Sequence, residues 1–146
     1  MNIGLIGAGL IGKKRADSLD SSDSLLIICD TNIDLAKDLA NKFSTDFTDN
    51  NIDIINNENI DTVIVSVVNK YAAKLSIDML LSGKNVLCEK PLGCNPKESE
   101  VILSSAKREK KIIKTGFNHR FHPSIIKAKE LIENNSIGKI INIRAR

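Results

Sequence analysis

Three glycines near the start of the chain have the spacing of a turn that binds a pyrophosphate. Gly7, Gly9 and Gly12 follow a short apolar run and lead directly into a helix-compatible segment. The first permits a tight turn off a strand, the second lets phosphates approach the backbone, and the third lets the helix pack closely on the sheet. N–H groups at the start of that helix would face the phosphates. A glycine-rich turn in an unrelated α/β domain is the alternative. The residues expected to contact a dinucleotide here are Gly7, Ala8, Gly9, Leu10, Ile11 and Gly12.

An acidic residue stands where an adenosine ribose would be bound. The apolar run 25–29 ends in Asp30, roughly 20 residues beyond the glycines, where a carboxylate can accept hydrogen bonds from ribose hydroxyls. The same carboxylate would repel the 2′-phosphate of NADP. Thr31 and Asn32 follow, with no arginine to reverse the preference. The pattern predicts NAD as the cofactor, with NADP disfavoured, and contacts from Asp30 and Thr31.

Lys90 is the candidate for chemistry beyond binding. It lies between Glu89 and Pro91, directly after the apolar run 85–88 and so at the mouth of a buried strand. A lysine there can hold a sugar hydroxyl or the nicotinamide ribose, and partial desolvation would let it assist proton transfer. A solvated Lys–Glu pair before a rigid turn is the alternative.

The loops after three later strands should meet the glycine turn. They span residues 66–69, 88–93 and 116–123. Ligands of open α/β sheets bind beyond the carboxyl ends of the strands, so these loops are expected to converge on one crevice. Ser66, Val67 and Asn69 are the cofactor contacts expected from the first of them.

The elements that would position these residues alternate along the chain. Short apolar runs separated by longer amphipathic segments indicate βα repetition and a parallel sheet. Strands are expected at 3–6, 25–29, 46–47 (a weak one), 62–67, 85–88 and 112–116, and helices at 10–20, 33–43, 49–56, 71–81 and 96–110. Asn95 before Pro96 is expected to cap the last of these helices. The fold class is therefore α/β, a Rossmann-type doubly wound parallel sheet.

The last residues follow a different pattern. A further helix is expected over 121–135, and then Ile141, Ile143 and Ala145 alternate with polar residues, as in a strand with one buried face. A single strand there would have little to pair with, and an unpaired strand edge needs cover. We therefore expect a dinucleotide-binding domain over 1–120. Residues 121–146 would be a linking helix and the first strand of a truncated α+β substrate domain.

Charge and aromatic content exclude a nucleic-acid partner. The net charge is +3 and aromatic residues make up 3% of the chain, too little for a phosphate footprint or for base stacking. Three basic residues, Lys13, Lys14 and Arg15, follow the glycine turn. We expect them to form a solvated helix face, with a phosphate contact as the alternative.

No apolar run is long enough to cross a membrane, and the chain starts directly in the first strand with no export signal. We therefore expect a cytoplasmic protein with no membrane partner. Cys29, Cys88 and Cys94 lack the spacing of metal ligands, so no metal site is expected. The first two lie in strand-like runs and should serve as small buried hydrophobes.

Together these motifs resemble the N-terminal half of the Gfo/Idh/MocA family of sugar and inositol oxidoreductases, and the match runs over the whole chain. The residues that carry it are the glycines of 7–12, Asp30, Glu89-Lys90-Pro91 and the stretch 116–123, while 137–140 is similar to the family's passage into its second domain. The resemblance implies that Lys90 is the lysine of a catalytic dyad. It also implies that Glu89 and Asn118 lie near the nicotinamide ribose and that Arg120 lies on the sugar side.

The chain departs from the family's pattern in two places. After the fourth strand the family often has Thr-Pro and a later His, where this chain has Val67-Val68 and Ala72. The family's general base, usually a His working with an Asp, lies in the C-terminal domain, beyond this chain. His119 and His122 do not match that position, so they are expected to be solvated loop residues or to pack at the start of the helix.

The resemblance implies an NAD-dependent oxidoreductase, truncated, that transfers hydride between nicotinamide and a carbinol carbon of a sugar, inositol or nucleotide sugar. Lys90 would bind or polarise the reacting oxygen, and the missing domain would supply the base, so the chain by itself is expected to be inactive. The expected partners are a sugar or polyol substrate and either a second copy of the chain or a complementing C-terminal domain. The alternatives are a non-catalytic NAD(H)-binding module or subunit completed by another chain, and then a decayed gene fragment.

Overall fold

Six parallel strands form one sheet in the order β3-β2-β1-β4-β5-β6. The computed structural model describes residues 1–144. The strands are β1 (Asn2–Ile6), β2 (Ser24–Cys29), β3 (Asp46–Thr48), β4 (Thr62–Val65), β5 (Asn85–Cys88) and β6 (Ile113–Thr115). The chain builds outward from β1 to β3, then crosses back to β4 and builds outward in the other direction. This reversal creates a switch point between β1 and β4, where open α/β sheets bind their ligands. The predicted fold class is confirmed.

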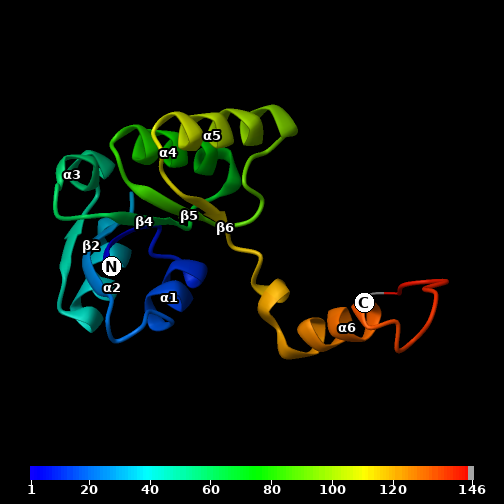
Figure 1. Ribbon diagram of the computed structural model, residues 1–146. Coiled ribbons are helices and arrows are strands. Elements are labelled where there is room, and N and C mark those ends of the chain that lie inside the picture. Colours follow the sequence, from blue (N-terminus) through cyan, green and yellow to red (C-terminus); the bar gives the residue numbers. More distant parts are fainter. Residues whose placement is uncertain (145–146) are drawn as a thin grey trace. The chain divides into compact units, whose positions relative to one another are not determined.

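Helices cover both faces of the sheet (Figure 1). They are α1 (Leu10–Asp17) and α2 (Ile33–Phe43) on one face, and α3 (Asn51–Asn56), α4 (Asn69–Leu81) and α5 (Pro96–Arg108) on the other. Successive residues of β1 serve opposite cores: Leu5 packs with the α1 and α2 side, and Ile6 packs with the α3, α4 and α5 side. The strands therefore read as continuous apolar runs, because both of their faces are buried.

Asparagine side chains cap three helices. Asn32 caps α2 and Asn50 caps α3, each accepting a hydrogen bond from an N–H of the first turn. Asn95 does the same for α5, through the N–H of Glu98 at 3.0 Å, and the Glu98 carboxylate accepts the Cys94 N–H at 2.8 Å in return. Such reciprocal bonds satisfy donors that a helix start otherwise leaves unpaired. The cap predicted at Asn95 is confirmed.

The chain divides into two compact units, Met1–Gly116 and a second unit that starts at Phe117. The second unit holds a 3₁₀ helix, η1 (Asn118–Phe121), and α6 (Pro123–Glu133). The helix predicted over 121–135 is thus confirmed with shorter bounds. None of the helices formed by residues 1–144 is both long and apolar enough to cross a bilayer.

The strand predicted at the end of the chain is wrong for the residues described. Residues 141–144 form no strand, and Ala145 and Arg146 lie outside the described residues. Ile141 is 95% exposed and Ile143 77% exposed. An alternating pattern makes a strand only where a neighbouring strand pairs with its backbone and a core covers its apolar face. Within residues 1–144 these isoleucines have neither.

Candidate functional site

A cavity of about 580 Å³ opens at the carboxyl ends of β1, β2 and β4. This is the switch point of the sheet, and the volume is within the range of small-molecule and cofactor sites, roughly 300–1,000 Å³. Strand β4 ends at Val65, two residues earlier than predicted, so the next two residues belong to the loop that borders the cavity. Six of the predicted cofactor contacts line it: Gly7, Gly9, Asp30, Thr31, Ser66 and Val67.

The three glycines of the turn have different surroundings. A Cβ on Gly7, whose φ is +99°, would lie 2.2 Å from the carbonyl oxygen of Ser66. A Cβ on Gly12 would lie 1.8 Å from the carbonyl oxygen of Gly7. A Cβ on Gly9 would meet nothing within 4 Å. The fold itself therefore requires Gly7 and Gly12, whereas Gly9 leaves open space on the side of the cavity that it lines.

Asp30 ties the end of β2 to the glycine turn. Its Oδ2 accepts the N–H of Ala8 at 2.7 Å, and its Oδ1 accepts the N–H of Asn32 at 2.9 Å. Each carboxylate oxygen keeps a further lone pair for a donor in the cavity. Asp30 can therefore support the turn and accept ribose hydroxyls at the same time.

Two of the helices that start at the cavity, α1 and α4, lack side-chain caps. Gly9 is the N-cap of α1 and Val68 the N-cap of α4; both residues line the cavity, and neither makes a side-chain cap bond. The first-turn N–H groups of a helix have no partner within the helix, and together with the helix dipole they favour an anion. The helices α2, α3 and α5 have asparagine caps instead, so the uncapped starts of α1 and α4 fit a phosphate-bearing ligand.

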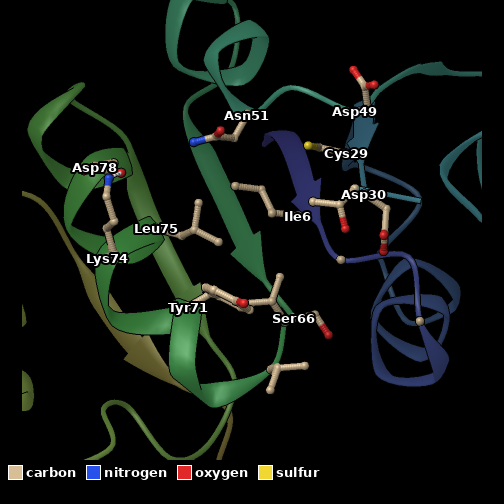
Figure 2. Close-up of a pocket in the computed structure, with 15 residues that line it drawn as sticks. Ile6, Cys29, Asp30, Asp49, Asn51, Ser66, Tyr71, Lys74, Leu75 and Asp78 are labelled. Carbon is tan, nitrogen blue, oxygen red and sulfur yellow. Dashed lines mark hydrogen bonds and ion pairs between the residues drawn. The ribbon is translucent and has the colours of Figure 1, made fainter. Parts of the chain in front are cut away.

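One face of α4 forms a wall that the sequence reasoning missed. Figure 2 shows Tyr71, Leu75 and the Lys74–Asp78 ion pair on this helix, across the cavity from Cys29 and Asp30. The Lys74 Nζ lies 2.6 Å from the Asp78 carboxylate. A sequence signal existed, because residues 71, 74, 75 and 78 have the spacing of one helix face. Asp49 and Asn51 add polar groups near the start of α3.

The other residues predicted in the glycine turn, and Asn69 from the loop after β4, do not line the cavity. Ala8 is buried and contributes its N–H to Asp30, while Leu10 and Ile11 are exposed at the start of α1. Gly12 packs beneath the turn. Asn69 is the first residue of α4 and is exposed.

Glu89 and Lys90 follow β5 and lie outside the cavity lining. The Glu89 carboxylate forms an ion pair with the guanidinium of Arg15, and the two side chains are 14% and 17% exposed. The Lys90 side chain is exposed and makes no hydrogen bond or ion pair with any other residue in 1–144. The peptide bond between Lys90 and Pro91 is cis.

Asn118 and Arg120 belong to η1 in the second unit, whereas the cavity lies in the first. The Arg120 guanidinium lies over the ring of Phe117, 5.0 Å from its centre. His119 and His122 are exposed, and the Nδ1 of His122 shares a hydrogen bond with the Ser124 hydroxyl at 2.6 Å.

The expectation of a solvated basic face on α1 is confirmed for Lys13 and Lys14 and is wrong for Arg15. The two lysines are exposed, whereas Arg15 turns inward to Glu89. Arg15 lies three residues after Gly12 and one before Ala16, both of which are buried. It therefore shares the packed face of the helix, and that spacing could have identified it.

The cysteines offer a test of the packing around the cavity. Burial, with Asp30 close by, raises the pKa of the Cys29 thiol to about 11, and burial also raises the pKa of Cys88. At pH 8 about one Cys29 thiol in a thousand is ionised, and only the thiolate reacts. We expect Ellman's reagent to label one thiol of the native chain, the exposed Cys94, and all three after unfolding. The Cys94→Ser variant is the control: rapid labelling of this native variant would contradict the structure.

This chain is similar to a known protein family and to characterised dehydrogenases. A family model described as an oxidoreductase family with an NAD-binding Rossmann fold matches residues 1–117. The myo-inositol 2-dehydrogenase of Thermotoga maritima is 32% identical over 152 residues, an alignment that covers all of this chain and 45% of the relative. The levoglucosan dehydrogenase of Pseudarthrobacter phenanthrenivorans is 29% identical, over 99% of this chain and 40% of its own length.

The fold is also similar to that of a solved dehydrogenase structure. The crystal structure of myo-inositol 2-dehydrogenase from Lactobacillus plantarum superposes with a TM-score of 0.89 at 27% identity, covering 97% of this chain and 43% of its own. The chain therefore spans less than half the length of each of these relatives.

Proposed function

Because the chain belongs to the Gfo/Idh/MocA oxidoreductase family, we propose that its first unit binds NAD(H) for hydride transfer to or from a carbinol carbon of a sugar or polyol. One observation carries the proposal: Gly9, with open space at its Cβ position, and the carboxylate of Asp30 line the same cavity at the switch point of the sheet. The first provides room for a pyrophosphate beside an uncapped helix start. The second provides acceptors for ribose hydroxyls.

The dinucleotide would cross the sheet at this point. Its adenosine ribose would meet Asp30 after β2, and its pyrophosphate would lie at Gly9 and the start of α1. Its nicotinamide would extend over the ends of β4 and β5, toward Ser66 and Lys90. This direction follows from the strand order and from the rule that dinucleotides bind across the switch point.

The cofactor without a 2′-phosphate, NAD(H), is the expected partner rather than NADP(H). A 2′-phosphate on the adenosine ribose would face the Asp30 carboxylate, and Thr31 and Asn32 offer no positive charge to offset the repulsion. Lys74 is a cation in the cavity, but its ammonium is paired with Asp78.

Lys90 is proposed as the residue that acts on the substrate. When bound, the cofactor accepts or returns the hydride of the carbinol carbon. The exposed Lys90 ammonium would donate a hydrogen bond to the reacting oxygen and stabilise negative charge that develops there. Oxidation of an alcohol also releases the hydroxyl proton, which a general base must take. We propose that this base lies in the part of the relatives beyond the match, so that residues 1–146 bind nucleotide without turnover.

A polyol or sugar is the proposed substrate class. The relatives are named as dehydrogenases of myo-inositol and of levoglucosan, and both compounds carry carbinol carbons. Arg120 is proposed to serve the substrate side, and residues 121–146 to begin the substrate domain. The apolar side chains of Phe121 and Ile125 on the second unit are exposed and would be covered by such a domain.

A thermal-shift titration with NAD, NADH, NADP and NADPH tests the proposal. A ligand at 100 times its dissociation constant stabilises by about 2.7 kcal/mol. For a domain of this size that raises the melting temperature by roughly 5–10 °C. We expect a clear rise with NAD and NADH and little with the two phosphorylated forms. A cooperative melt that none of the four shifts would overturn the proposal, and rapid NADH formation from NAD and myo-inositol would overturn the binding-only part.

A further inference from the structure

One ion pair links two segments that are far apart in the sequence, and a third segment lies against it. Arg15 lies in α1, three residues after the glycine turn, and Glu89 lies 74 residues later, directly before Lys90. The Nε and a terminal nitrogen of the guanidinium both contact Oε1 of the carboxylate. Both side chains are largely buried, so the pair is shielded from competing water and salt.

The third segment is the backbone of Gly116. A Cβ on this residue would lie 2.6 Å from the Arg15 guanidinium and 2.8 and 2.9 Å from the two Glu89 carboxylate oxygens. The Gly116 N–H donates to the carbonyl oxygen of Cys88 at 2.8 Å, which holds this backbone beside the end of β5. The ion pair therefore occupies the space that any side chain at position 116 would need.

A pair of this kind is better suited to fixing geometry than to adding stability. The cost of removing two charges from water offsets much of their attraction, but loss of one partner leaves the other charge buried and uncompensated. Two guanidinium nitrogens contact the same carboxylate oxygen, so the pair fixes the position of that oxygen. The net charge of the pair is zero, so the pair itself adds neither positive nor negative charge beside Lys90.

The pair lies on the side of the sheet where its zero net charge would affect cofactor binding. Strand β5 lies on the β4 side of the switch point, which is the side that the nicotinamide half of a dinucleotide occupies in the proposed function. The oxidised nicotinamide ring carries a positive charge and the reduced ring is neutral. A single uncompensated charge beside Lys90 would therefore change the relative affinity for the two forms.

We propose that Arg15 is a positioning residue for the nicotinamide side of the site. It orients the Glu89 carboxylate, fixes the loop that carries Lys90 relative to the glycine turn, and cancels the Glu89 charge. This inference rests on the proposed function. It assigns the two halves of the pair opposite effects on the preference between NAD⁺ and NADH.

Calorimetric titration of the full 146-residue chain tests the assignment, with NAD⁺, NADH and ADP-ribose as the probes. In Glu89→Gln the Arg15 charge remains, and we expect the preference to move toward NADH. In Arg15→Gln the Glu89 charge remains, and we expect it to move toward NAD⁺. Each change should be about threefold or more, on Coulombic grounds at an effective dielectric constant near 20. ADP-ribose, which lacks the nicotinamide, should bind all variants alike.

Two controls separate this role from a merely structural one. The double variant with glutamine at both positions should restore the wild-type ratio of NAD⁺ to NADH affinity, and Arg15→Lys should retain it. Equal weakening of all three ligands, or an unchanged ratio in Glu89→Gln, would overturn the assignment. Because Glu89→Gln is isosteric, it decides the question even if Arg15→Gln does not fold. If the wild-type chain binds none of the three ligands, the proposed function fails instead.

Discussion

The Gly9→Ala variant should melt at the temperature of the wild-type chain and lose about tenfold or more of its affinity for NAD, at least 1.4 kcal/mol. The backbone at Gly9 has φ −70° and ψ −170°, which alanine adopts without strain, and the added Cβ would meet no protein atom within 4 Å. That same methyl group would occupy the space through which a pyrophosphate approaches the start of α1. A thermal melt and a calorimetric titration measure the two effects separately.

Gly12→Ala is the matched control, because it makes the same chemical change three residues later. Its Cβ would lie 1.8 Å from the Gly7 carbonyl oxygen, a backbone atom that cannot move without opening the turn. We expect a loss of about 3 kcal/mol or more in the free energy of unfolding. That corresponds to a melting temperature lower by roughly 10 °C or more. If both variants lost stability equally, or if Gly9→Ala kept full affinity for NAD, the division of roles within the turn would be wrong.

Asp30→Asn should weaken NAD binding by about 10–100-fold and reduce the discrimination against NADP. The substitution removes the charge and one acceptor from a group that holds Ala8 and Asn32 by their N–H groups. A hydrogen bond to a charged group contributes about 1.5–3 kcal/mol, which is the basis of this range. Titration with NAD and NADP gives the ratio directly. The same loss should appear in ADP-ribose binding, because the affected contacts are on the adenosine side.

Asp38→Asn supplies the control for that experiment, since Asp38 is an exposed acid on α2 and does not line the cavity. It makes the same change in net charge at a distance from the ligand. We expect its affinities for both nucleotides to match those of the wild-type chain. If Asp30→Asn discriminated against NADP as strongly as the wild type, the selectivity would have to reside in other residues.

The arrangement of the first unit could be predicted because its determinants are local. Runs such as Val63-Ile64-Val65 indicate strands buried on both faces, and Asn95 before Pro96 indicates a helix start. The glycine turn and Glu89-Lys90-Pro91 are also local patterns. The family that they suggested is confirmed by the match over residues 1–117. The strand expected from Ile141 does not form for the opposite reason: alternation describes one apolar face, and a strand also needs a pairing partner, which these residues do not have within 1–144.

The interior of the site was less predictable because its contacts are non-local. The ion pair of Arg15 with Glu89 links residues 74 positions apart, and no periodicity in the sequence relates them. The spacing of residues along α1 in the sequence indicates that Arg15 turns inward, but it does not indicate which acid Arg15 contacts. The cavity wall at Tyr71 and Lys74 has helical spacing, yet only the strand order places that face opposite Asp30. The roles of Lys90, Asn118 and Arg120 remain predictions.

The wall formed by α4 also has a spectroscopic consequence. Tyr71 is the single tyrosine of the chain, and the chain contains no tryptophan. Tyr71 lines the cavity (Figure 2), so the ultraviolet emission of the whole protein originates almost entirely from one side chain at the proposed binding site. Quenching beyond the absorbance of the added nucleotide itself would therefore report occupancy of that cavity, with no label.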